Sequence, residues 1–93
     1  MHAVIGQVKL DPNRRDEALK MIKERGEAMV RGFTGVIAGY WARALDSDIQ
    51  HSIWLFDNEE NARAAFAVFG KGPPPGAPAT FVSVDLCEVV RQT

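Results

Sequence analysis

Residues 36–70 read VIAGYWARALDSDIQHSIWLFDNEENARAAFAVFG, and this stretch decides the fold. Its first part contains Val36, Ile37, Tyr40 and Trp41, residue types that are enriched in strands, and a strand is predicted over 36–45. The residues at 46–48 have the chemistry of a turn, and a second strand is predicted over 50–56. Because the link is too short for a crossover, the two strands are expected to form an antiparallel hairpin.

Alternation with period two assigns the residues of this hairpin to faces. It places Tyr40 on the same face as Val36 and Trp41 on the other face. On the second strand it places His51 opposite to Trp54. His51 and Trp54 are therefore not expected to serve one pocket within a subunit, although His51 remains available for a dimer contact.

A helix follows the hairpin directly. Asp57 is expected to cap it, with Glu60 reaching back as in a capping box, and Gly70 is expected to end it. The predicted inner stripe consists of Ala62, Ala65, Phe66 and Phe69. The opposite side is also apolar, with Ala64, Ala67 and Val68. A helix with so little polar surface is expected to be covered on more than one side.

The chain before the hairpin predicts one strand and one helix. The strand covers 3–10, and the helix runs to about Arg31, with Asp11 or Asn13 as its cap. Gly32 is expected to end the helix in a left-handed conformation. Gly26 lies within the helix, and it indicates either close packing against the sheet or room for a ligand.

A proline-rich loop over 71–80 and a last strand over 81–90 complete the order β-α-β-β-α-β. In that last strand Val82 is expected on the face opposite to Phe81. We predict an α+β fold, a single ferredoxin-like domain over 1–93 with a four-stranded antiparallel sheet and two helices on one face. Several strands are apolar on both faces, so we predict a homodimer through the open sheet face, in the manner of a dimeric α+β barrel.

Composition excludes several classes of protein. Eleven Lys and Arg against twelve Asp and Glu give a net charge of −1, which argues against a nucleic-acid partner. No apolar run is long enough for a membrane span, and no signal peptide is visible. The single Cys87 fits a reducing, cytoplasmic setting. Neither a metal site nor a nucleotide cradle is expected, because the ligand spacings and glycine motifs that they need are missing.

Two segments resemble a known family. Gly32-Phe33 is similar to the entry to the second strand in the domains of this family. The segment from Phe56 to Ala62 is similar to their junction between the third strand and the second helix. The family is that of the antibiotic-biosynthesis-monooxygenase-like (ABM-like) domains of the dimeric α+β barrel superfamily. The resemblance covers nearly the whole chain in element order. It implies a small homodimer that binds an aromatic metabolite, with cofactor-independent oxygenation of a phenol or quinol as a possible reaction and no cofactor.

The sequence departs from the family's pattern at two places. Arg31 stands where a proline is usual, which affects only the turn. Ala65 and Phe66 occupy the region of the second helix where many members, haem-degrading ones included, carry a histidine. Because a neutral imidazole is the usual axial ligand of haem iron, this departure weakens a haem-binding hypothesis.

Such an oxygenase must hold a flat ring, take a proton and stabilise charge. The candidate catalytic residues are Trp54 to stack on the ring, Arg43 to stabilise an oxyanion, Tyr40 to orient a phenol or relay a proton, and His51 as a general base. The candidate substrate-binding residues are Phe33, Trp41, Phe56, Phe66 and Phe69. Each has a structural alternative: core packing for the aromatic residues, a solvated charge or interface ion pair for Arg43, and simple exposure for His51.

Three functions therefore stay open. The first is binding of an aromatic metabolite, with or without oxygenation. The second is a non-enzymatic dimeric stress or accessory protein whose pocket is filled by its own aromatic residues. The third is haem binding or degradation.

Overall fold

The computed structural model describes all residues from 1 to 93, and it has the predicted element order. The elements are β1 (His2–Leu10), α1 (Arg15–Met21), η1 (Ile22–Gly26), α2 (Glu27–Arg31), β2 (Val36–Arg43), β3 (Ile49–Phe56), α3 (Glu59–Phe69) and β4 (Ala79–Glu88). The strands form one four-stranded sheet in the order β2-β3-β1-β4, and every neighbouring pair is antiparallel. The predicted ferredoxin-like α+β fold is confirmed.

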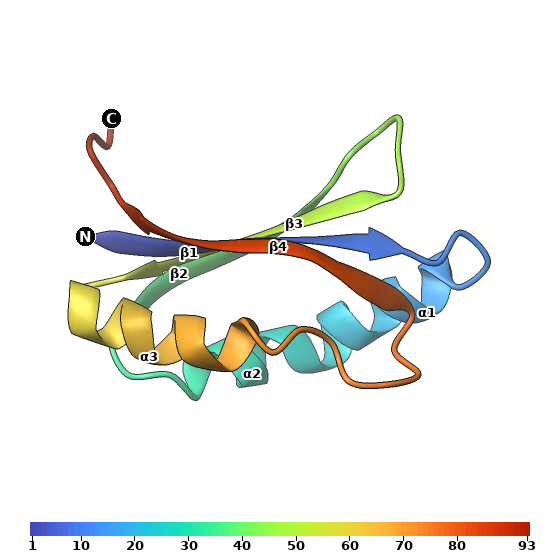
Figure 1. Ribbon diagram of the computed structural model, residues 1–93, viewed down its shortest axis with the longest axis horizontal. Coiled ribbons are helices and arrows are strands. Elements are labelled where there is room, and N and C mark those ends of the chain that lie inside the picture. Colours follow the sequence, from blue (N-terminus) through green and yellow to red (C-terminus); the bar gives the residue numbers. More distant parts are fainter.

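Both helical segments pack against one face of the sheet. Figure 1 shows α1, α2 and α3 in a layer beneath the strands and no helix above them. In the register of the sheet, Trp54 of β3 pairs with Val4 of β1 and with Gly39 of β2. These three residues share the face that meets the helices. The core on this face includes Val4, Trp54 and the fully buried Phe56. The other face carries Tyr40, Ile53 and His51.

Two irregularities in register correct the predicted faces. Val36 pairs with Phe56 while Ala38 pairs with Leu55, so Ile37 is an extra residue in β2. This bulge turns Val36 toward the core, where it packs on the same side as Trp41, and leaves Ile37 55% exposed. The prediction that Val36 shares a face with Tyr40 is therefore wrong.

A similar shift occurs in β4. Gln7 pairs with Ser83 and Val8 pairs with Phe81, so Val82 is the residue without a partner. Phe81 thereby lies on the same side of the sheet as Val84 and lines the cavity described below, although Phe81 and Val82 are similarly exposed, at 46% and 47%. The strict alternation predicted for this strand is interrupted at that point.

The first helix is continuous from Arg15 to Arg31, but its middle turn, η1, is a π-helix. Its start carries no side-chain cap, because the Asp11 carboxylate instead accepts a hydrogen bond from the Asn13 amide at 2.9 Å in the preceding turn. Its end is also not as predicted. Gly32 has a right-handed φ of −68°, and the left-handed residue is Gly35, with φ 77°.

The N-terminal cap of α3 lies one residue after the predicted cap, Asp57. The Asn58 side chain accepts a hydrogen bond from the Asn61 amide at 2.9 Å, so Asn58 is the cap. Asp57 instead accepts a hydrogen bond from the side chain of Asn61 at 2.8 Å. The inner stripe is as predicted, with Ala62 and Ala65 fully buried. Its opposite side is exposed to solvent in this chain, contrary to the expected second cover.

No helix of the structure has the length and apolar character needed to cross a membrane.

Candidate functional site

A cavity of about 470 Å³ lies between the sheet and the helical layer. The helix-facing side of the sheet forms one wall, the first helix and the end of α3 form the second, and the loop before β4 forms the third. Its volume is in the range of small-molecule sites, which is about 300–1,000 Å³. Sixteen of its 25 lining residues are hydrophobic. None of the 25 is an acidic residue, a basic residue, a tyrosine or a cysteine.

Four aromatic rings form a continuous row along this cavity. Phe33 and Phe69 have ring centroids 5.0 Å apart, and those of Phe69 and Trp54 are 3.5 Å apart. Trp54 then meets Trp41 edge-on, with centroids 6.0 Å apart. All four residues line the cavity. The row offers both ring faces and ring edges, which are the surfaces that planar aromatic molecules contact.

Two glycines make room for the indole rings. A Cβ at Gly26 would lie 3.2 Å from Cζ2 of Trp41, and a Cβ at Gly39 would lie 3.1 Å from Cδ1 of Trp54. Either contact is tighter than ordinary van der Waals distance, so any side chain there would displace a ring. Gly26 is also the last residue of the π-helical turn, a feature that is frequent near functional sites. Of the two alternatives for Gly26, the structure shows close packing against the sheet.

Two polar side chains in this region are well buried. Trp54 is 5% exposed, and its Nε1 is buried without a hydrogen-bond partner. Gln50 is 6% exposed and lines the cavity. The Gln50 Oε1 atom accepts a hydrogen bond from Nε of Arg43 at 3.2 Å. The cavity is therefore mainly apolar, with Gln50 as a buried amide in its wall.

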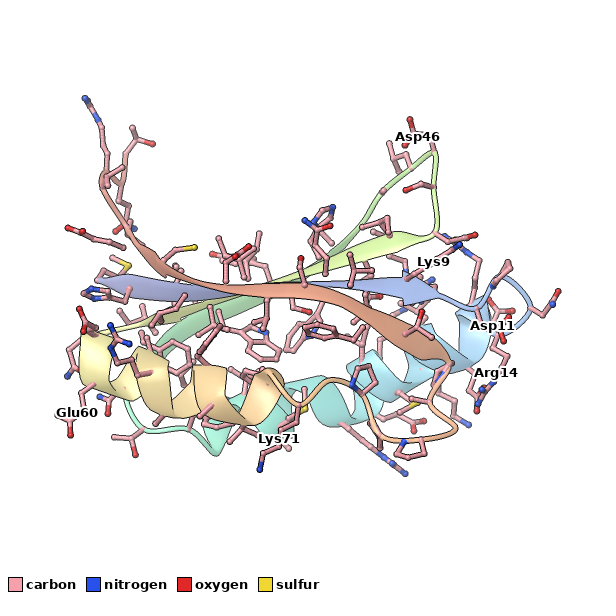
Figure 2. The ribbon with its side chains drawn as sticks, viewed as in Figure 1. Lys9, Asp11, Arg14, Asp46, Glu60 and Lys71 are labelled. Atoms are coloured by element: carbon pink, nitrogen blue, oxygen red, sulfur yellow. The ribbon has the colours of Figure 1, made fainter.

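The loop before β4 is held in place by Arg14. Its guanidinium donates to the backbone carbonyls of Gly76 at 3.0 Å and Ala77 at 3.4 Å. Figure 2 shows Arg14 and Asp11 at the end of the molecule where this loop meets the start of α1. Arg14 also pairs with Glu17 at 2.6 Å, and this hydrogen bond holds the pKa of the Glu17 carboxyl below its ordinary value. The ion pair thus orients the side chain that fixes the cavity's third wall.

The structure brings together four of the candidate residues from the sequence. Trp54, Trp41, Phe33 and Phe69 all line the cavity. Phe56 and Phe66 do not: Phe56 is fully buried in the core, and Phe66 packs against that core. These two positions match the structural alternative of core packing.

The three candidate polar residues lie elsewhere. Tyr40, 58% exposed, and His51 lie on the sheet face opposite to the cavity. Arg43 shares the cavity's side of the sheet but does not line the cavity, since its guanidinium bonds to Gln50 and to the backbone carbonyl of Arg15 at 2.9 Å. Tyr40 and His51 therefore do not reach this cavity within one subunit, and Arg43 contacts its lining at Gln50.

Sequence reasoning missed the polar residues of the cavity. Gln50 and Ser52 line it, and both precede Trp54 on β3 at intervals of two. The alternation along β3 that places Trp54 on the helix-facing side of the sheet places Gln50 and Ser52 on that side as well. Phe81 was missed for another reason, because its place in the cavity depends on the shift of register in β4.

Comparisons with known proteins support the fold. No family model and no curated protein sequence matches this chain. Solved structures do match it, and two of them are structures of one protein. One is the haem-degrading protein MhuD from Mycobacterium tuberculosis with two haems bound in its active site: TM-score 0.78, 19% identity, covering 100% of this chain and 99% of that one. The other is a substitution variant of MhuD with two manganese protoporphyrin IX molecules bound per active site: TM-score 0.76, 18% identity, covering 100% and 98%. This chain therefore shares the α+β fold of these two structures, and the predicted fold class is confirmed.

Proposed function

We propose that the protein binds an uncharged, planar aromatic molecule in the cavity between its sheet and its helices. The observation that carries this proposal is the cavity itself, about 470 Å³ in volume, lined by four aromatic rings in a row and by no charged side chain. Burying an ionic ligand against such a wall would leave its charge without a partner, which is costly. A neutral ring system would instead gain apolar burial and ring contacts.

The activity to test is cofactor-independent oxygenation of a phenol. With 1-naphthol, one atom of dioxygen would become the new carbonyl of the naphthoquinone, and the other would leave as water with the two hydrogens lost from the substrate. The substrate supplies all the electrons. No lining side chain is a base, so the phenol would pass its proton to a water molecule, and the chain's own contribution would be to bind and orient the ring. Oxygen uptake with 1-naphthol, absent without protein, would support this reaction.

Porphyrin binding is a second candidate, favoured by the two solved structures with porphyrins in their sites. The residues of this chain fit haem poorly. The cavity offers no imidazole for iron and no Lys or Arg for the propionate groups, and Met21 and Met29 are its sulfur donors. We expect little or no shift of the Soret band on titration with haemin. A saturable shift at one or two equivalents would favour porphyrin binding instead.

A thermal-shift panel of polycyclic phenols, quinones, flavin and haemin tests the binding proposal directly. A ligand at 100 times its dissociation constant adds about 2.7 kcal/mol of stability, or roughly 10–20 °C in a domain of this size. Trp54→Ala should abolish the shift, while Trp54→Phe keeps a ring at the site and should retain part of it. A flat response to the whole panel would count against the proposal and favour a non-enzymatic accessory protein.

We also propose that two copies associate through the open sheet face, where Ile53 and Leu55 lie near Tyr40. Supporting this, Ile5, Ile53 and Leu55 lie on this face among polar residues such as His51, and no element of the chain covers it (Figure 1). Light scattering should give a dimeric mass at micromolar concentration. Ile53→Glu should give a monomer, whereas Ala67→Glu, on the exposed side of α3, should not. A monomeric mass for the unaltered protein would refute the proposal.

A further inference from the structure

We infer that Gln50 is the polar recognition group of the cavity, that Arg43 fixes its orientation, and that the ligand carries a carbonyl oxygen at this end. The inference rests on the proposed binding of an aromatic molecule, and it adds what that molecule must display. It concerns a residue that is nine-tenths buried yet not sealed within the protein.

The orientation of the Gln50 amide follows from the chemistry of its neighbour. A guanidinium has only donors, so the atom that Gln50 turns toward Arg43 must be its oxygen, as the 3.2 Å bond shows. Arg43 is itself held, because it also donates to the backbone carbonyl of Arg15 at 2.9 Å. The Arg15 guanidinium in turn pairs with Asp48 at 2.6 Å. The Gln50 Oε1 atom is thus turned away from any ligand.

The Gln50 Nε2 group is left as a donor. It donates to no protein acceptor, and it is not among the enclosed atoms without partners, which are Nδ1 of His2 and Nε1 of Trp54. Because Gln50 lines the cavity and its Oε1 atom is taken by Arg43, we assign the Nε2 group to the cavity wall. An amide hydrogen that no protein group accepts is free to bond to an acceptor on a ligand at that place.

The position of Gln50 suggests the shape of the ligand. Gln50, Ser52 and Trp54 project from one face of β3, and four residues of strand span about 13 Å. The aromatic row begins at Trp54 and Trp41 and continues to Phe69. A ligand that uses both ends therefore has a flat apolar body over the rings and an oxygen acceptor toward Gln50. Aryl ketones and quinones have this chemistry, and unsubstituted aromatic hydrocarbons do not.

A matched pair of probes tests the inference on the full-length protein. The probes are 2-acetylnaphthalene and 2-ethylnaphthalene, which have nearly the same shape and differ in the carbonyl. One neutral hydrogen bond corresponds to a preference of about threefold to tenfold for the acetyl compound, measured as the ratio of dissociation constants by equilibrium dialysis. Gln50→Glu keeps the size of the side chain and the bond to Arg43 but removes the donor, so the preference should vanish or reverse.

Two further variants separate recognition from folding. Gln50→Leu removes the amide without adding a charge, and it should likewise bring the ratio to about one with both probes still bound. Arg43→Met frees the amide to turn its oxygen toward the ligand, so it should lower the ratio without weakening the ethyl compound. Arg31→Met, on the exposed side of α2, is the matched control and should change neither constant.

The outcomes are distinguishable. If the native protein binds both probes equally, or if Gln50→Glu retains the preference, the role of Gln50 is refuted while cavity binding stands. If neither probe binds, cavity binding itself is refuted, and this inference is refuted with it. A preference that is lost in both Gln50 variants and kept in the Arg31 variant supports the inference.

Discussion

Gly35 is the position where one methyl group should be most damaging to the fold. Its φ is +77°, a region that L side chains enter at a cost of about 1–2 kcal/mol. A Cβ there would also collide with the Asp57 carboxylate and the Asn61 amide, which hydrogen-bond to each other at 2.8 Å. Separating them loses about 1 kcal/mol more. We expect Gly35→Ala to lower the free energy of unfolding by about 2–3 kcal/mol, or roughly 8–20 °C in melting temperature.

Gly76 provides a matched control for the backbone component. Its φ is +82°, but nothing lies within 4 Å of the Cβ that an alanine would add. Gly76→Ala should therefore cost only about 1 kcal/mol, from the backbone alone. Urea unfolding followed by tryptophan fluorescence, at one protein concentration, gives both values. Concentration must be fixed because association would change the apparent stability.

A coupled variant tests the cause of the difference. In an Asp57→Ala/Asn61→Ala background the colliding groups are gone, so adding Gly35→Ala should cost no more than Gly76→Ala costs in the native protein. If the two glycine variants are equally destabilised in the native background, the collision contributes nothing and the reasoning is refuted.

Three other predictions concern the wall of the cavity and the acid response. Arg14→Gln removes both side-chain bonds to the loop before β4, so hydrogen exchange of that loop should rise about fivefold or more, whereas Arg31→Gln should leave it unchanged. The pKa of Glu17 is lowered in the folded state, so its contribution to stability is complete above the unfolded value near 4.5 and is lost as pH falls through the folded value. Glu17→Gln should therefore reduce the fall in urea midpoint between pH 6 and pH 3. Gly26→Val should press the neighbouring indole ring out of place, costing about 1–3 kcal/mol and shifting the tryptophan emission.

The sequence predicted the sheet and the helices because their patterns are strong and local. Ala62 and Ala65 recur at the helical interval, and both are fully buried. The polar turn between β2 and β3 forces a hairpin, and the structure shows it. The helix starts were predicted less well, since Asp57, Asn58 and Asp11 all have capping chemistry, and only packing decides which side chain meets a free amide.

The two register shifts could not be read from the sequence. Around Ile37 the chain reads Val-Ile-Ala-Gly, without a polar residue to set the phase of alternation. Phe81 and Val82 are both large and apolar, so either could face the helices. The partner strand decides which residue is extra, and pairing between distant segments is not encoded in a local pattern.

The candidate site was predicted in its apolar part and missed in its polar part. Trp41 and Trp54 follow from alternation once the helix-facing side of the sheet is known. Tyr40 and His51 were chosen for their chemistry, and the same alternation puts them on the far face. Gln50 has unremarkable chemistry as an isolated residue. Gln50 becomes a candidate only because its side chain is buried and accepts a hydrogen bond from Arg43, and a single sequence shows neither of these.

The likeness to porphyrin-bound structures and the lining of this cavity point in different directions, and the difference is physical. A fold positions a cavity, but the side chains in it determine which ligand is stabilised. Haem brings an iron that takes imidazole or thiolate ligands and two carboxylates that need donors or solvent. This cavity offers five aromatic rings, four of them in a row, with a buried amide and no charge. These side chains are the reason why we propose a neutral ring with a carbonyl as the ligand, and a stronger response to haemin than to aryl ketones would show that the fold is the better guide.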